Sequence, residues 1–425
     1  MTPREFLKLY RYDHRALCGD YVPAAPLTAE PGDRIGVVLL HTGGPPTLAD
    51  VPDFVYNRYM DPLASDWRLP RALRPLYARS QAWIQSTALA RCYEKIGGCS
   101  PLHRLVSEQA SALEQALLTG TPSPAQVTYK TYVAMRHAHP FLPEVAQQMQ
   151  ADEITKVVLL PLFPQYAQRT TGSLFASWWM QQTHGRMPTW PVTAVREYAV
   201  HPKYVQALSE RIDEALQRFS DRARRGVHLV FAAQHLPAPG YGTLQGHHDP
   251  YCCLVQATVE AVMQHRGQDR PHHVTFQPSR GATDVARLSL KQTMGTLGRQ
   301  ARTSVLVVPL SHVTDHLETA YQLDVVMREE AYTQGLEHYE VTAGLNCHPM
   351  FIEALAEITR RQAIHGLPVF SGDGLDASGT LPEVALPGVS ASGQPTTSRC
   401  VQCDHTMMPR QWAPMRQSAP STTGV

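Results

Sequence analysis

The chain of 425 residues is long enough for about two or three domains. Its apolar content of 43% and charged content of 18% are those of an ordinary globular protein, and a formal net charge of +1 gives no support for a nucleic-acid partner. No apolar run approaches the roughly 18 residues that a membrane span requires, and residues 1–6 lack the apolar region of a signal peptide. We therefore expect a cytoplasmic protein, and the composition leaves peripheral membrane contact open.

Twenty histidines are a high number for a chain of this length. Imidazole is the side chain that binds metals and carries protons near neutral pH, and composition alone does not distinguish such a role from enrichment without function. The eight cysteines are scattered along a long chain, which favours reduced thiols over a framework of disulfides.

Short apolar runs alternate with stretches of helical spacing along most of the chain. The helical spacing is clearest in residues 201–219, where Val205, Leu208, Ile212 and Leu216 fall on one face. Continuous apolar runs of strand length are typical of buried parallel strands. The runs are residues 35–40, 127–134, 156–162, 192–195, 227–233, 273–277, 304–310 and 339–342. This alternation predicts an α/β fold with parallel sheets.

The eight predicted strands fall into two sets of four, divided by the helix at 201–219. We therefore predict two similar lobes, each with a four-stranded parallel sheet. The predicted organisation is a lead-in at 1–33, lobes at 34–200 and 201–345, a helix within 346–365 that packs back on the core, and a disordered tail at 366–425. Neither lobe has a G-x-G-x-x-G motif after its first strand, so a dinucleotide site is not supported.

Two of these predicted strands end in polar residues that could perform chemistry. The run at 227–233 leads into Gln234 and His235, and the run at 304–310 leads into the segment 311–319, which carries two histidines and two carboxylates. Parallel strands open together at the carboxyl edge of a sheet, where α/β folds bind ligands. We therefore expect both strand ends to face one cleft.

Six stretches, in this order and at this spacing, resemble motifs of the ferrochelatase family and together cover about residues 34–360. They are 36–62 with its His-Thr-Gly-Gly-Pro turn, 96–102 (IGGCSPL), 135–140 (MRHAHP), 160–173 (LPLFPQYAQRTTGS), 313–324 (VTDHLETAYQLD) and 344–355 (GLNCHPMFIEAL). The resemblance implies two Rossmann-like, chelatase-type lobes with a porphyrin cleft between them. It also implies the insertion of Fe²⁺, as the substrate metal, into protoporphyrin, or into coproporphyrin as in some bacterial members. We expect a monomer or a homodimer.

The resemblance assigns roles to the segment 313–319. Glu318 matches the carboxylate of the family's DHIE motif, which faces the porphyrin, so we expect it to handle the metal or remove a proton. His316 and Asp315 would orient it and relay protons. The structural alternative is that Glu318 interacts with a helix N-terminus and that the other two cap a strand-to-helix turn.

The strand end at residue 234 departs from the family. The family has SAHGLP, with a histidine opposite the glutamate, where this chain has Gln234 followed by His235. Glutamine cannot take a proton at neutral pH, and losing a general base costs about 10²–10⁴-fold in rate. Two hypotheses follow. The chain is a working ferrochelatase that uses Glu318 with Gln234 or His235, or it is a weak or inactive paralogue that binds porphyrin or haem for regulation or delivery.

Three other family positions have gained a histidine. They are His41 in the glycine-rich turn, where the family has asparagine, His137 in the MRY motif, where it has tyrosine, and His312 before the DHIE motif, where it has an aromatic or apolar residue. The gain is either sequence drift or a reshaped site in which imidazoles approach the porphyrin face as ligands to haem or another metal.

The C-terminal tail contains Cys400 and Cys403, and some ferrochelatases bind a [2Fe–2S] cluster through C-terminal cysteines. Such a cluster needs four thiolates, and no cysteine follows Cys403, so we do not expect a cluster. A zinc site formed with His405 would also need a fourth ligand. We interpret the pair as a remnant.

Overall fold

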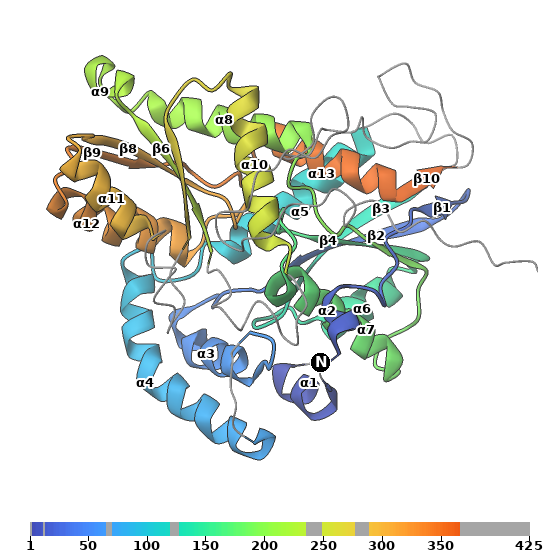
Figure 1. The fold of residues 1–425 in the computed structure, drawn as a ribbon. Coiled ribbons are helices and arrows are strands. Elements are labelled where there is room, and N and C mark those ends of the chain that lie inside the picture. Colours follow the sequence, from blue (N-terminus) through green and yellow to red (C-terminus); the bar gives the residue numbers. More distant parts are fainter. Residues whose placement is uncertain are drawn as a thin grey trace, which may run out of the picture. The chain divides into compact units, whose positions relative to one another are not determined.

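Two four-stranded parallel sheets form the framework of the fold (Figure 1). The computed structural model describes residues 2–11, 13–64, 70–119, 127–234, 249–276 and 289–365. Three of the sequence predictions, for His235, for the Cys400–Cys403 pair and for a disordered tail at 366–425, lie outside these residues.

The first sheet has the order β3-β2-β4-β5, and all of its pairings are parallel. Its strands are β2 (Arg34–His41), β3 (Thr128–Met135), β4 (Lys156–Pro161) and β5 (Val192–Ala194). Seven of the eight residues of β2 are buried, which explains why this strand reads as a continuous apolar run.

The second sheet has the order β7-β6-β8-β9 and is also parallel throughout. Its strands are β6 (His228–Ala233), β7 (His272–Phe276), β8 (Ser304–Pro309) and β9 (His338–Val341). In both sheets the strands lie in the order second, first, third and fourth along the chain. The predicted two sets of four parallel strands, and with them the α/β fold class, are confirmed.

Helices connect the strands in both halves. In the first half they are α3 (Val51–Met60), α4 (Arg74–Glu94), α5 (Leu102–Thr119), α6 (Leu142–Ala151) and α7 (Ser173–Thr183). In the second half they are α8 (Pro202–Leu216), α9 (Asp221–Arg225), α10 (Tyr251–His265), α11 (Leu290–Arg299) and α12 (Met327–Thr333). The predicted helix at 201–219 is α8, which begins at Pro202, a residue suited to the first turn of a helix.

A π-helical segment occurs at the same place in both halves. η3 (Gln168–Gly172) follows β4 and leads into α7, and η6 (Glu318–Val326) follows β8 and leads into α12. Since β4 and β8 are the third strands of their sheets, the two segments are equivalent in the repeat. Single π-helical turns are frequent at functional positions.

The N-terminal lead-in is more structured than the sequence suggested. It contains α1 (Pro3–Leu9), α2 (His14–Leu17) and β1 (Leu27–Ala29), and its Phe6 and Leu17 are buried. The elements have three to seven residues, too few for a periodic pattern to be read. β1 pairs in parallel with β10 (Ala363–His365), which follows α13 (Pro349–Gln362).

The predicted C-terminal helix is α13, and it packs against α5 of the first half and α8 of the second. Across the part of the chain that the structure describes, no helix combines the length and the apolar character needed to cross a bilayer.

Candidate active site

The ends of β6 and β8 lie next to each other at the carboxyl edge of the second sheet. The strands pair in parallel up to Ala232 opposite Pro309, and the Leu310 N–H donates to the Ala232 carbonyl at 3.0 Å. Gln234 and the segment that begins at Ser311 therefore leave the sheet side by side, as the parallel arrangement predicts.

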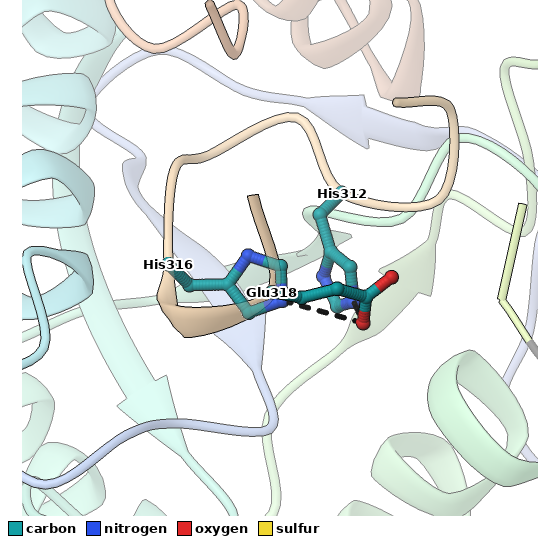
Figure 2. A group of neighbouring side chains, drawn as sticks. All are labelled: His312, His316 and Glu318. Carbon is teal, nitrogen blue, oxygen red and sulfur yellow. Dashed lines mark ion pairs between the residues drawn. The ribbon is translucent and has the colours of Figure 1, made fainter. Parts of the chain in front are cut away.

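His312, His316 and Glu318 come together in the segment that follows β8 (Figure 2). The Oε2 atom of Glu318 lies 3.9 Å from Nε2 of His312 and 3.8 Å from Nε2 of His316. The centroids of the two imidazole rings are 3.9 Å apart. Glu318 is the first residue of η6, and the loop from His312 to His316 brings both imidazoles beside the carboxylate.

Asp315 anchors this segment to the turn before α13. Its carboxylate accepts hydrogen bonds from the Gly344 N–H at 3.1 Å and from Nδ2 of Asn346 at 2.7 Å. The Asp315 N–H in turn donates to Oδ1 of Asn346 at 2.9 Å. These contacts give Asp315 a positioning role, whereas its predicted part in a proton relay stays a prediction.

Gln109 of α5 fixes the same segment from the first half of the molecule. This buried side chain accepts from the Thr314 hydroxyl at 2.8 Å and donates to the Asn346 carbonyl at 2.9 Å. Sequence analysis missed Gln109, because its partners lie 205 and 237 positions away and no local pattern marks it.

Gln234 is held at the end of β6 by two hydroxyl groups. Its N–H donates to Ser311 Oγ at 2.7 Å and to the Tyr251 hydroxyl at 3.0 Å, and the two hydroxyls are themselves hydrogen-bonded. The side-chain amide contacts Nε2 of His312 and hydrogen-bonds Glu318. Sequence analysis also missed Ser311 and Tyr251. Ser311 is adjacent to His312, one of the three gained histidines, and that position was the only available signal.

Burial controls the charges of the cluster. It raises the pKa of Glu318 to about 7, against the opposing effects of the Gln234 hydrogen bond and the nearby Arg58. Burial also lowers the pKa of His316 to about 4. The pKa of His312 lies well below its usual range, because the ring is buried and because the imidazoles of His316 and His41 are close to it. At neutral pH both rings of the cluster are therefore uncharged, which is the form that binds metals.

Two of the three gained histidines lie at this site. His41 ends β2 of the first sheet, and its ring stacks on Phe163 at 5.0 Å and lies 6.0 Å from the ring of His312. The carboxyl ends of a strand from each sheet are thus in contact here. Nδ1 of His41 accepts a hydrogen bond from the Gly43 N–H at 3.0 Å.

The third gained histidine, His137, belongs to a separate buried cluster. Its Nε2 lies 2.9 Å from Oδ2 of Asp61, which also accepts two hydrogen bonds from Arg136, at 2.6 and 3.0 Å. Although burial alone would raise the pKa of Asp61, Arg136 and His137 hold it well below its usual range. His137 therefore has a structural partner in Asp61, and it does not belong to the cluster around Glu318.

Fold and site together define an α/β protein of two parallel sheets that presents imidazole and carboxylate groups at a sheet edge. Two neutral imidazoles and one carboxylate are a ligand set that suits ferrous iron. Comparison with known proteins then identifies the family: the chain belongs to the ferrochelatases, whose family model matches residues 34–363.

The relatives support this assignment over most of the chain. The ferrochelatase of Synechococcus sp. (strain JA-3-3Ab) is 35% identical over 345 residues, which cover 79% of this chain and 96% of the relative. The ferrochelatase of Geotalea daltonii is 34% identical over 333 residues, 77% of this chain and 98% of the relative. Among solved structures, SirB from Bacillus subtilis with Fe³⁺ is 10% identical with a TM-score of 0.44, over 78% of this chain and 96% of that one. A likeness of that size bears on neither substrate nor metal.

Proposed function

We propose that the protein inserts Fe²⁺ into protoporphyrin IX in haem biosynthesis. The observation that carries the proposal is the position of Glu318 beside His316 at the carboxyl edge of the second sheet, in a chain of the ferrochelatase family. In the reaction one Fe²⁺ replaces two pyrrole N–H protons. The iron keeps its oxidation state, and two protons are released.

The chemistry makes three demands on the protein. A base must accept the pyrrole protons, ligands must replace the water molecules on the metal, and the site must bind a bent macrocycle better than a flat one. Glu318 is suited to the first two demands, because its carboxylate is largely buried yet 19% of its side-chain surface remains accessible. His316 lies within reach to stabilise the carboxylate or to share a proton with it. Asp315 holds both residues in place through its bonds to the 344–346 turn.

The test is an anaerobic assay of Fe²⁺ insertion into protoporphyrin with the natural chain and with Glu318→Gln. Glutamine keeps the size of the side chain and its hydrogen-bonding contact with Gln234, and it removes the group that ionises. We expect the rate to fall by about 10²–10⁴-fold. The matched control is Glu337→Gln, at an exposed position before β9, which should leave the rate unchanged. A Glu318→Gln protein with full activity would exclude the proposed role.

Gln234 favours a second candidate function. Because glutamine replaces the histidine that the family has at this position, we also consider a paralogue that binds porphyrin or haem without metallating it. This candidate predicts no turnover by the natural chain, quenching of porphyrin fluorescence on binding, and turnover in Gln234→His. Turnover by the natural chain at a rate typical of enzymes would exclude it.

A further inference from the structure

His312 brings a second imidazole to the Glu318 carboxylate. The residue is buried, with 7% of its surface exposed, and it follows β8 by three positions. Nε2 of His312 touches the side-chain amide of Gln234. The ring of His312 therefore lies directly beside the position from which an imidazole on residue 234 would act.

The donor atoms of the three side chains lie close to the spacing that a shared cation requires. Donor atoms bound to one metal at about 2.0–2.2 Å lie about 2.8–3.6 Å apart when their bonds meet at 90–110°. In the cluster, the Glu318 oxygen lies 3.9 and 3.8 Å from the two imidazole nitrogens, and all three donor atoms lie within 4.8 Å of one another. The two carboxylate–imidazole distances must shorten by at least about 0.2–0.3 Å, and rotation of the rings must close the gap between the two imidazole nitrogens, for the three donors to share one ion.

The surroundings of His312 leave it available as a ligand. Its Nδ1 is buried and has no hydrogen-bond partner among the residues that the structure describes. The nitrogen that faces Glu318 is Nε2, which also hydrogen-bonds the neutral side-chain amide of Gln234, and a cation would displace this amide without breaking an ion pair with it. The ring is therefore not committed to a structural ion pair, in contrast to His137, which is bonded to Asp61.

The backbone holds the three ligands in place before any ion arrives. All three come from a span of seven residues, His312 to Glu318, spaced H-x₃-H-x-E. The Asp315 contacts with Gly344 and Asn346, together with the bond from Thr314 to Gln109, fix the centre of this span. Preorganised ligands lose little freedom when they bind.

We propose that His312, His316 and Glu318 form a three-ligand site that receives the divalent cation, and that His312 supplies the imidazole that residue 234 lacks. The identity of the cation as Fe²⁺ on its way to a porphyrin rests on the proposed function. The existence of a divalent-cation site on this segment does not.

Co²⁺ binding to porphyrin-free protein tests the site directly. Titrations followed by visible absorption would use the full chain carrying Cys400→Ser and Cys403→Ser, so that tail thiols do not compete for the ion. We expect His312→Phe to weaken Co²⁺ binding at least tenfold, because loss of a direct ligand should cost no less than loss of a supporting residue. Phenylalanine fits the aromatic or apolar residue that the resemblance gives for this position. His312→Gln keeps a polar side chain and should give the same loss of Co²⁺ affinity. It replaces His312→Phe in the titration if the phenylalanine variant folds poorly. His338→Ala, at an exposed position that starts β9, is the matched control.

The results separate this inference from the proposed function. Co²⁺ affinity that stays within twofold in both His312 variants, or a natural chain that binds no Co²⁺, would overturn the site. The insertion assay then adds a second readout, in which His312→Phe should lose activity and the double variant Gln234→His/His312→Phe should regain it by moving the imidazole to the other strand. Full activity in His312→Phe, together with loss in Glu318→Gln, would overturn the inference and leave the proposed function standing. An inert protein whose Co²⁺ binding depends on His312 would support the site and contradict the proposed function.

Discussion

The side-chain amide of Gln234, at the end of β6, contacts Nε2 of His312, which lies 78 positions later in the segment after β8. The contact joins a glutamine and a histidine at two positions where, by the sequence resemblance, we expect a histidine and an aromatic or apolar residue. The two departures from the pattern therefore meet at one point in space. The consequence is that changes at either residue should be read together, since residues in contact do not act independently.

Asp315 is predicted to affect the Glu318 cluster only by holding its segment in place. Asp315→Ala removes an acceptor for the Gly344 N–H and for the Asn346 amide, and we expect the free energy of unfolding to fall by about 2–3 kcal/mol. Asp315→Asn keeps one acceptor oxygen and should lose less. In chemical denaturation the free energy of unfolding should decrease in the order natural chain, Asp315→Asn, Asp315→Ala. Co²⁺ affinity, measured where each variant is fully folded, should fall in the same order, and an unchanged affinity in Asp315→Ala would contradict the positioning role.

The Asp61–Arg136 pair is predicted to be a large contributor to stability. Both side chains are almost fully buried, and Arg136 also lies over the ring of Phe6 at 4.3 Å. Asp61→Asn leaves a buried guanidinium without its counter-charge, so we expect a loss of about 3–5 kcal/mol in the free energy of unfolding. The double variant Asp61→Asn/Arg136→Met should lose less than the sum of the single variants. Additive losses in this cycle would mean that the two side chains are not coupled.

His41 is predicted to make the protein less stable in mild acid. Burial lowers the pKa of His41 to about 3, and the Gly43 N–H occupies its Nδ1, whereas an unfolded histidine has a pKa near 6.5. Between these values the unfolded chain binds a proton that the folded chain does not. Stability therefore falls as the pH drops through this window, by up to about 1.4 kcal/mol per pH unit for this group.

The variant His41→Asn isolates this effect, because asparagine has an acceptor at a similar position and does not titrate. With metal removed by a chelator, the loss of unfolding free energy between pH 7 and pH 5.5 should be about 1 kcal/mol smaller in His41→Asn than in the natural chain. His338→Asn, at an exposed position, serves as the control and should follow the natural chain. Equal losses in the natural chain and His41→Asn would show that His41 does not titrate as expected.

The strands could be predicted from sequence because burial on both faces makes them continuous apolar runs. β6, for example, lies at residues 228–233 where the run at 227–233 predicted it. The short elements β1 and β10 could not be predicted, since each has three residues and is stabilised mainly by pairing with the other end of the described fold. Tertiary contacts of this kind leave no local pattern.

The site was predictable only in part for the same reason. Glu318 and His316 stand in one motif and were expected to act together, and the structure places them 3.8 Å apart. His312 was identified as a gained histidine, but its contact with Gln234 depends on the pairing of β6 with β8. Gln109 carried no signal at all, because its function is to join two segments that are far apart in the sequence.

Gly344 is predicted to be required for the anchoring of Asp315. A Cβ atom at this position would lie 2.9 Å from Oδ1 of Asp315 and 3.1 Å from its backbone nitrogen, so alanine must push the carboxylate away from the turn. We expect Gly344→Ala to lower the free energy of unfolding by about 1–3 kcal/mol, as overpacking does, and to weaken Co²⁺ binding through the displaced segment. Gly226→Ala is the matched control, because the nearest atom to its added Cβ is 3.8 Å away and its φ is −101°. That variant should keep the Co²⁺ affinity of the natural chain. If Gly344→Ala also binds Co²⁺ normally, the segment from His312 to Glu318 does not depend on the Asp315 anchor for its ligand geometry.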